Sequence, residues 1–311
     1  MKYLVGQDAV TEGPPSTRFG RNRRFQTLLK WLWRVAVKPI LQNLGFIVDH
    51  APQSVLPRIW WISSGLMGVM PLHAAGDHSH GSRENTLSHV VSSYAPTLKS
   101  LRYSRQRLRD SENVKNPLVT VVAMPQTENN RPLKVEPEIT MIEAAFPRAT
   151  ILRTPTAKRT LESMQTCNIG HFICHGYSDP QDPSKSGLIL SSGSLTLEDL
   201  SQYYFPNAHI MYLSACSTAK TSTEKLVDEV LHLGSGFQLV GFPHVIATLW
   251  EVNDKEAVKV ASDFYDRIKG IEGAYLEEGV VARALHDVVK KQRDKLPDDP
   301  IAWVAQVHFG P

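Results

Sequence analysis

From Pro117 onward, short apolar runs alternate with segments whose apolar residues recur every three to four positions. The first pattern is typical of buried strands and the second of amphipathic helices. Strands are predicted at 118–125, 149–153, 169–174, 187–191, 208–214 and 244–250, and helices at 135–146, 156–165, 196–202, 224–240, 254–269 and 277–293. This alternation favours a mainly parallel α/β sheet covered by helices on both faces. Ligands of such sheets bind at the carboxyl ends of the strands.

The chain before Pro117 has a different pattern. Residues 26–44 and 97–109 are predicted helices, and residues 59–72 are predicted to form strand, turn and strand, with hairpins around Trp60 and Leu72. Polar residues 110–117 are the best linker candidate. We therefore expect an α+β N-terminal subdomain of helix and hairpins at 1–116, followed by the α/β subdomain at 117–311.

Composition excludes several classes of protein. A net charge of +3 over 311 residues gives no strong case for nucleic acid or a membrane surface. Residues 1–20 contain no apolar core of a secretory signal, and the apolar stretch at 59–72 is shorter than the roughly 20 residues of a membrane span. Three cysteines are too few for a disulfide framework, which favours a reducing compartment and a cytoplasmic location.

Two predicted strands each end in a reactive side chain. The segment IGHFICHG at 169–176 carries His175, and IMYLSACSTA at 210–219 carries Cys216. A thiol must ionise to act as a nucleophile, and a nearby imidazole can take its proton. Cys216 follows His175 by about 40 residues, an order and distance that suit a caspase-like His/Cys pair. The pair points to a cysteine hydrolase that needs no metal and no organic cofactor.

Neighbouring residues compete for these roles. Alternation along the strand places His171 on the same face as His175, and only the position at the strand end favours His175. Cys174 points to the opposite face, so we expect it to be structural, and Cys167 lies in a loop without a role. Cys216 itself could be a buried small hydrophobe, although the small residues around it leave room beside the sulfur.

Backbone donors and a loop complete this candidate site. The N–H groups of Gly176 and Cys216 are placed to form an oxyanion hole, since a glycine lets the backbone approach a ligand closely. Asp179 follows in the proline-rich loop GYSDPQDPSKSG. Its side chain either only stabilises a turn, or it orients a substrate-binding residue in a loop that walls the substrate cleft. No acid is evidently placed as a third member of a triad.

The segment VIATLWEVNDKEAV at 245–258 brings acids to the end of another predicted strand. Glu251 and Asp254 could bind a basic side chain of a substrate. Asp254 could equally be the N-cap of the helix that follows, a position that aspartate favours. Both interpretations stay open at this point.

Two weaker signals have ordinary explanations. Residues 18–38 combine seven basic residues with Trp31 and Trp33, a composition found in helices that bind membranes or nucleic acid, but also in an amphipathic helix with a solvated basic face. His73, His78, His80 and Asp77 could hold a metal. Their irregular spacing matches no zinc pattern, so we expect a solvated loop and no metal.

The chain as a whole resembles the CHAT-domain family of caspase-like proteases, which often follow tetratricopeptide repeats. The resemblance extends over nearly the whole chain, including PRIWWISSG, HFICHGYSDPQDPSKSGLIL, YLSACSTA, VIATLWEVND and the closing HFG. The glycines of GSG at 234–236 depart from the family's usual alanine-rich helix.

The resemblance implies a caspase-like fold and a cysteine endopeptidase with His175 as base and Cys216 as nucleophile. It also implies kinship with separases, whose similar Leu-Trp-acid run holds an arginine at the cleavage site; on that ground Asp254 is the specificity residue and cleavage follows a basic residue. The expected setting is a signalling or programmed-death pathway, with a protein substrate and a repeat-domain or other sensor in cis or in trans. The alternative is a catalytically silent scaffold in a signalling complex.

Overall fold

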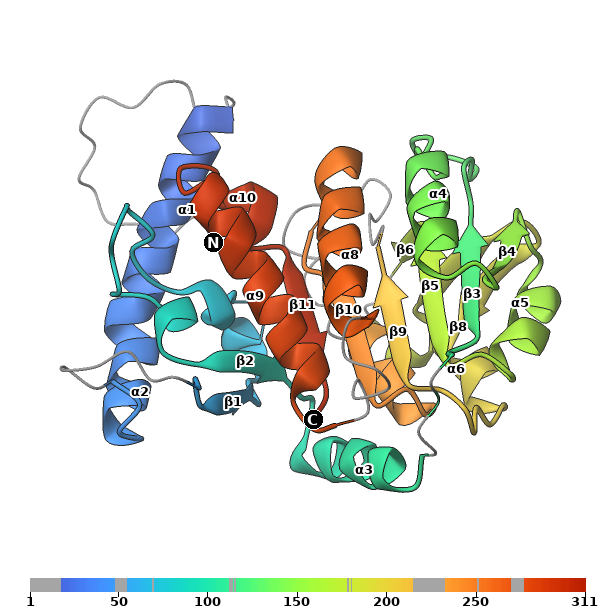
Figure 1. The fold of residues 1–311 in the computed structure, drawn as a ribbon, viewed down its shortest axis with the longest axis horizontal. Coiled ribbons are helices and arrows are strands. Elements are labelled where there is room, and N and C mark those ends of the chain that lie inside the picture. Colours follow the sequence, from blue (N-terminus) through green and yellow to red (C-terminus); the bar gives the residue numbers. More distant parts are fainter. Residues whose placement is uncertain are drawn as a thin grey trace.

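A computed structural model gives the arrangement of the chain in space (Figure 1). The structure describes residues 18–47, 55–68, 70–111, 114, 116–177, 179, 181–214, 233–250, 252–269 and 277–311. Of the predicted site residues, His175, Gly176, Asp179 and Asp254 are among them, whereas Cys216 and Glu251 lie outside the described residues.

Strands from both predicted subdomains form one eight-stranded sheet in the order β1-β2-β11-β10-β9-β5-β3-β4. Their bounds are β1 Arg58–Trp61, β2 Val91–Tyr94, β3 Val119–Ala123, β4 Thr150–Arg153, β5 Ile169–Ile173, β9 Ile210–Leu213, β10 His244–Thr248 and β11 Gln306–Phe309. Only β11 is antiparallel to a neighbour, β10. The mainly parallel sheet is therefore confirmed, while the subdomain boundary at 116 and 117 stays a prediction.

The helices lie on both faces of the sheet, as the sequence predicts. One face is covered by α4 Glu136–Ala145, α8 Asp254–Lys269 and α9 Val280–Lys295, which run side by side in front of the sheet (Figure 1). The other face packs against α1 Arg18–Leu32, α5 Ala157–Met164, α6 Leu197–Ser201 and the helical residues 233–239. Alternation along β3 explains the two layers, since Val119, Val121 and Ala123 join the first core and Val122 joins the second.

Shorter elements complete the chain. A π-helical turn, Trp33–Val37, joins α1 to α2 Lys38–Asn43, and α3 Leu98–Arg109 begins at Thr97, which forms a capping box with Ser100. A second, three-stranded sheet contains β6 Gly176–Tyr177, β7 Gly187–Leu190 and β8 Gly193–Thr196. Helix α10 Pro300–Trp303 precedes β11, and 3-10 turns occupy Gly65–Met67, Leu72–Ala74, Thr86–Ser88 and Pro183–Lys185.

The predicted hairpins around Trp60 and Leu72 are wrong. β1 pairs in parallel with β2, more than 30 residues further along the chain, and 3-10 turns at Gly65–Met67 and Leu72–Ala74 take the place of a second strand. Apolar residues in this segment are buried by packing rather than by strand pairing: Met70 and Leu72 both enter the core that α1 covers. Burial alone produces the same run of apolar residues as a buried strand would.

Candidate active site

Parallel pairing brings the ends of three strands to one edge of the sheet. β9 lies between β5 and β10 and is parallel to both. His175 follows β5, Asp254 begins the helix after β10, and the chain leaves β9 through Ser214, whose N–H donates to the carbonyl of Phe172 at 2.9 Å. Cys216 lies two residues further along the sequence, outside the described residues. Parallel pairing therefore brings the ends of β5, β9 and β10, with His175 and Asp254 beside them, to one edge of the sheet.

His175 is held by a backbone carbonyl. Its side chain is buried, and its Nε2 lies 2.8 Å from the carbonyl oxygen of Arg131, in the segment between β3 and α4. A carbonyl oxygen only accepts, so Nε2 carries the hydrogen and Nδ1 is the basic nitrogen of the neutral ring. A main-chain oxygen therefore orients the imidazole of His175, in the place where a catalytic triad has an acid. Because every residue has a carbonyl, the sequence does not reveal this group.

Gly176 presents its N–H away from the small sheet. Gly176 is paired with Leu188 in the antiparallel β6–β7 ladder, and the N–H of Ile189 donates to the carbonyl of His175 at 2.8 Å. This bond makes Gly176 and Leu188 a non-hydrogen-bonded pair, in which the glycine N–H points away from β7. β6 is an edge strand, so that N–H is directed outward, as an oxyanion donor must be.

Arg131 also contacts Asp254. The guanidinium and the Oδ1 atom of Asp254 form an ion pair at 3.5 Å, with side chains 44% and 24% exposed. One residue thus touches both the histidine, through its carbonyl, and the acid, through its side chain. His175 after β5, Arg131 between β3 and α4, and Asp254 at the start of α8 are brought together in this way.

The N-cap interpretation of Asp254 is wrong by one position. Asn253 precedes α8, and its Oδ1 accepts the N–H of Lys255 at 3.0 Å, which is the bond that defines an N-cap. Asp254 is the first residue inside the helix, and its carboxylate faces Arg131 instead. Asn253 takes the capping role, and the negative charge of Asp254 in the first turn of α8 stabilises the helix through its dipole in addition to pairing with Arg131.

Asp179 is explained by its own turn. Its Oδ1 accepts the N–H groups of Gln181 at 2.8 Å and Asp182 at 3.0 Å, and its own N–H donates to the buried hydroxyl of Ser186. This arrangement is an Asx turn that shapes the loop after β6. A part for Asp179 in orienting a substrate-binding residue stays a prediction.

A buried polar network lies beneath the strand ends. Glu138 of α4 accepts two bonds at Oε1, from Ser214 Oγ at 2.5 Å and from His171 Nε2 at 3.0 Å. The other nitrogen of His171 lies 2.7 Å from the hydroxyl of Tyr265, whose pKa is raised well above its ordinary value by burial, so that it is a donor at neutral pH. All four residues are buried, none more than 3% exposed. The network ties α4, α8 and β5 to the residue that follows β9.

His171 therefore has a structural position, distinct from that of His175. Sequence reasoning placed both on one face and did not single out Glu138. The available signal was an acid on the apolar stripe of helix 135–146, next to Ile139 and one turn before Ile142, both fully buried. A buried carboxylate requires partners, and the inward-facing His171 was the nearest candidate.

Comparison with known proteins identifies the family. The sequence model of the CHAT domain matches residues 26–311. The chain belongs to the CHAT domain family. No curated protein matches it. The fold of this CHAT domain is similar to solved structures of caspase-like cysteine peptidases, which confirms the predicted caspase-like α/β fold.

One structural neighbour is the complex of the pro- and mature domains of RgpB from Porphyromonas gingivalis, with a TM-score of 0.55, 9% identity, and coverage of 93% of the CHAT domain and 75% of that chain. Another is the Arg-specific cysteine proteinase gingipain R, with a TM-score of 0.50, 10% identity, and coverage of 74% and 55%. Separase from Saccharomyces cerevisiae, in complex with securin, has a TM-score of 0.50 and 13% identity over 88% of the CHAT domain. The CHAT domain spans 17% of that separase chain and about half of the gingipain chain, so these likenesses show the fold alone.

Close packing explains the unusual glycines of this CHAT domain. A Cβ at Gly234 would lie 2.7 Å from the ring of Phe309, and one at Gly236 would lie 2.4 Å from the side chain of Leu197. An alanine at either position would force the side chain of Phe309 or Leu197 to shift. The two glycines avoid these contacts, at a cost in helix propensity of about 1 kcal/mol each.

The weaker signals resolve in part. His73 and His78 are buried rather than solvated, and burial lowers the pKa of each to about 4. Within the described residues no cluster of three or more His, Cys, Asp or Glu could hold a metal. None of the described helices combines the length and apolar character needed to cross a membrane.

The basic helix packs on its own domain. Leu28, Leu29 and Leu32 of α1 enter the core, while Lys30 and Lys38 pair with Asp77 at 3.2 Å and Glu84 at 2.8 Å. These contacts support the interpretation as an amphipathic helix with a solvated basic face.

Proposed function

We propose that this CHAT domain is a cysteine endopeptidase in which His175 deprotonates Cys216. The thiolate attacks a peptide carbonyl to form a tetrahedral oxyanion, which collapses to a thioester with loss of the amine, and water then hydrolyses the thioester. The N–H groups of Gly176 and Cys216 stabilise the oxyanion. The observation that supports the proposal is the bond from His175 Nε2 to the Arg131 carbonyl, because it fixes the tautomer and leaves Nδ1 as the basic nitrogen that would accept the thiol proton.

Asp254 is the proposed recognition site for a basic P1 residue. The likeness of this CHAT domain to the Arg-specific gingipain and to separase is one of fold only. Its carboxylate already binds a guanidinium, that of Arg131. A substrate arginine would present the same group to the same acid, in competition with Arg131. Glu251, three residues before Asp254 in the sequence, is the second acid proposed to line this pocket.

The proposed setting follows from the family and from the thiol. A free catalytic cysteine suits a reducing compartment such as the cytoplasm. Protein substrates in a signalling or programmed-death pathway, with a tetratricopeptide-repeat or other sensor partner, are the proposed biological context. A nucleic-acid partner is not part of the proposal.

A covalent probe tests the chemistry. An arginyl chloromethyl ketone should alkylate Cys216 in the wild type, and His175→Ala should slow this labelling by at least about tenfold, since the imidazole supplies the base. Cys167 and Cys174 give an internal background: both are buried, and burial raises the pKa of the Cys167 thiol to about 12. Labelling of Cys216 that is unaffected by His175→Ala would instead support a catalytically silent scaffold.

A further inference from the structure

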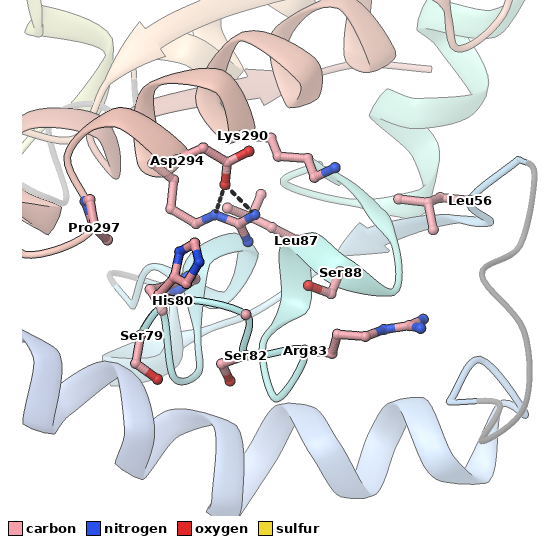
Figure 2. Close-up of a pocket in the computed structure, with 13 residues that line it drawn as sticks. Leu56, Ser79, His80, Ser82, Arg83, Leu87, Ser88, Lys290, Asp294 and Pro297 are labelled. Atoms are coloured by element: carbon pink, nitrogen blue, oxygen red, sulfur yellow. Dashed lines mark hydrogen bonds and ion pairs between the residues drawn. The ribbon is translucent and has the colours of Figure 1, made fainter.

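A pocket lies far from the candidate active site in the sequence and shares no residue with it. It has a volume of about 540 Å³ and opens between the loop at residues 77–88 and the last turns of α9 (Figure 2). Volumes of roughly 300–1,000 Å³ are typical of sites for small molecules. The candidate catalytic residues follow β5 and β9, whereas this pocket belongs to α9 and to the segment between β1 and β2.

The pocket carries an excess of positive charge. Arg83, Lys290 and Arg293 line it, against a single acid, Asp294. Within the described part of the chain, Arg83 and Lys290 form no ion pair, and both are exposed. A concave surface with uncompensated cations attracts anions more strongly than a flat one, because the walls exclude water.

The acids close to this pocket do not neutralise these cations. Asp77 pairs with Lys30 at 3.2 Å, and Glu84 pairs with Lys38 at 2.8 Å. Asp294 accepts from the Nε and Nη2 atoms of Arg293 at 2.9 and 2.6 Å, the two bonds drawn in Figure 2. No described carboxylate near the pocket therefore neutralises Lys290 and Arg83, and both are available to bind an anionic ligand.

Arg293 is held ready for a ligand. Besides Asp294, its Nη1 contacts Asn85 Oδ1 at 3.4 Å, and the side chain is only 12% exposed. A guanidinium has five N–H donors, of which these contacts use three. The remaining donors are fixed in direction before any ligand arrives, which reduces the entropy lost on binding.

His78, unlike the cations that line the pocket, offers a hydrogen-bond acceptor. Its Nε2 lies 2.8 Å from the carbonyl of Ala74, so Nε2 carries the hydrogen and Nδ1 is an acceptor. Nδ1 is buried and has no hydrogen-bond partner within the described residues, although His78 lines the pocket. Nδ1 is itself covered, so a ligand can bond to it only where the side chains over it move aside, and the ligand must then supply an O–H or N–H donor.

We propose that this pocket binds a small phosphorylated molecule that also carries hydroxyl or N–H donors, the class that includes nucleotides and sugar phosphates. The phosphate contacts Lys290, Arg83 and the fixed donors of Arg293, and a donor group of the ligand reaches His78. The hydroxyls of Ser79, Ser82 and Ser88 border the same space and suit a polar ligand.

Titration calorimetry at fixed ionic strength tests this site with inorganic pyrophosphate, AMP and a short acidic peptide as probes. We expect saturable binding of AMP, at least as tight as that of pyrophosphate, and a loss of at least about tenfold in the double variant Lys290→Gln with Arg83→Gln. The matched control is Lys295→Gln with Arg102→Gln, which removes the same charge from exposed positions outside the pocket and should change the affinity by less than about twofold.

Three results would overturn the proposal. One is no saturation by AMP or pyrophosphate below about 10 mM, an affinity too weak for a built site. Another is an equal loss in both double variants, which indicates attraction to net charge only. The third is tighter binding of the acidic peptide than of AMP with the same dependence on Lys290 and Arg83, which would make the pocket a peptide-docking surface.

Discussion

Removal of the Ser214 hydroxyl should destabilise this CHAT domain through Glu138. Ser214 Oγ donates to Glu138 Oε1 at 2.5 Å, and both side chains are buried. A buried hydrogen bond to a charged group contributes about 1.5–3 kcal/mol, whereas the change from serine to alanine removes a single oxygen. We therefore expect Ser214→Ala to lower the free energy of unfolding by about 2 kcal/mol, with a lower urea midpoint and an unchanged m-value.

A double-mutant cycle attributes this loss to the carboxylate. In a Glu138→Gln background the same bond is made to a neutral amide oxygen, worth about 0.5–1.5 kcal/mol, so Ser214→Ala should cost about 1 kcal/mol less there. Ser201→Ala is the control: its hydroxyl donates to a carbonyl at an exposed position and should matter by less than about 0.5 kcal/mol. Equal costs of Ser214→Ala in both backgrounds, or a cost no larger than that of Ser201→Ala, would refute the reasoning.

Three further predictions concern specificity and pH. Asp254→Asn should lower the rate of cleavage after arginine by one to three orders of magnitude, about 1.4–4 kcal/mol in transition-state binding. Helix α8 should stay intact because Asn253 caps it. An unchanged preference for arginine in a peptide library would show that Asp254 does not line the pocket. Arg131→Ala keeps the carbonyl that holds His175 and removes the competing guanidinium, so KM for arginine substrates should fall by up to about fivefold at constant kcat; a large loss of kcat would show that the side chain is needed. Burial lowers the pKa of His73 and His78 to about 4 and that of His244 to about 3. In the unfolded chain these histidines titrate near 6.5, so the unfolded state binds protons first, and the free energy of unfolding should fall as pH drops from about 6.5 towards 4, by up to about 1.4 kcal/mol per pH unit for each histidine. A flat unfolding midpoint between pH 7 and 5 would contradict this.

Much of the α/β part could be predicted from the sequence because its local signals agree with one another. The run at 169–174 is both apolar and bounded by turn residues, and β5 Ile169–Ile173 matches it. Thr156, the first residue of the predicted helix 156–165, is the N-cap of α5, and its hydroxyl accepts the N–H of Arg159. In such segments propensity, pattern and capping favour the same structure.

The N-terminal part and the closing strand could not be predicted in the same way. β11 Gln306–Phe309 lies between β2 and β10, and its position depends on partners over 50 residues away. The parallel pairing of β1 with β2 replaces the predicted hairpins because the intervening residues pack into the core instead of turning back. Four-residue strands carry too little periodicity to reveal their partners.

The candidate site shows the same division. His175 and Asp254 are found from residue type and position at strand ends, and the parallel sheet brings those ends together. The carbonyl of Arg131 cannot be found from the sequence, since every residue has one. Asn253 was missed as the cap because two adjacent residues, Asn253 and Asp254, both suit that position.

The central proposal is that Cys216 and His175 form a catalytic pair, with the imidazole ring and the sulfur within about 8 Å of each other. The most direct measurement is the cleavage of a peptide library by the wild type and by Cys216→Ala, with unfolding curves to show that both are folded. Loss of a nucleophile that acts with a base can cost on the order of 10⁶ in rate, so the variant should have no measurable activity. Activity of Cys216→Ala within tenfold of the wild type would contradict the account.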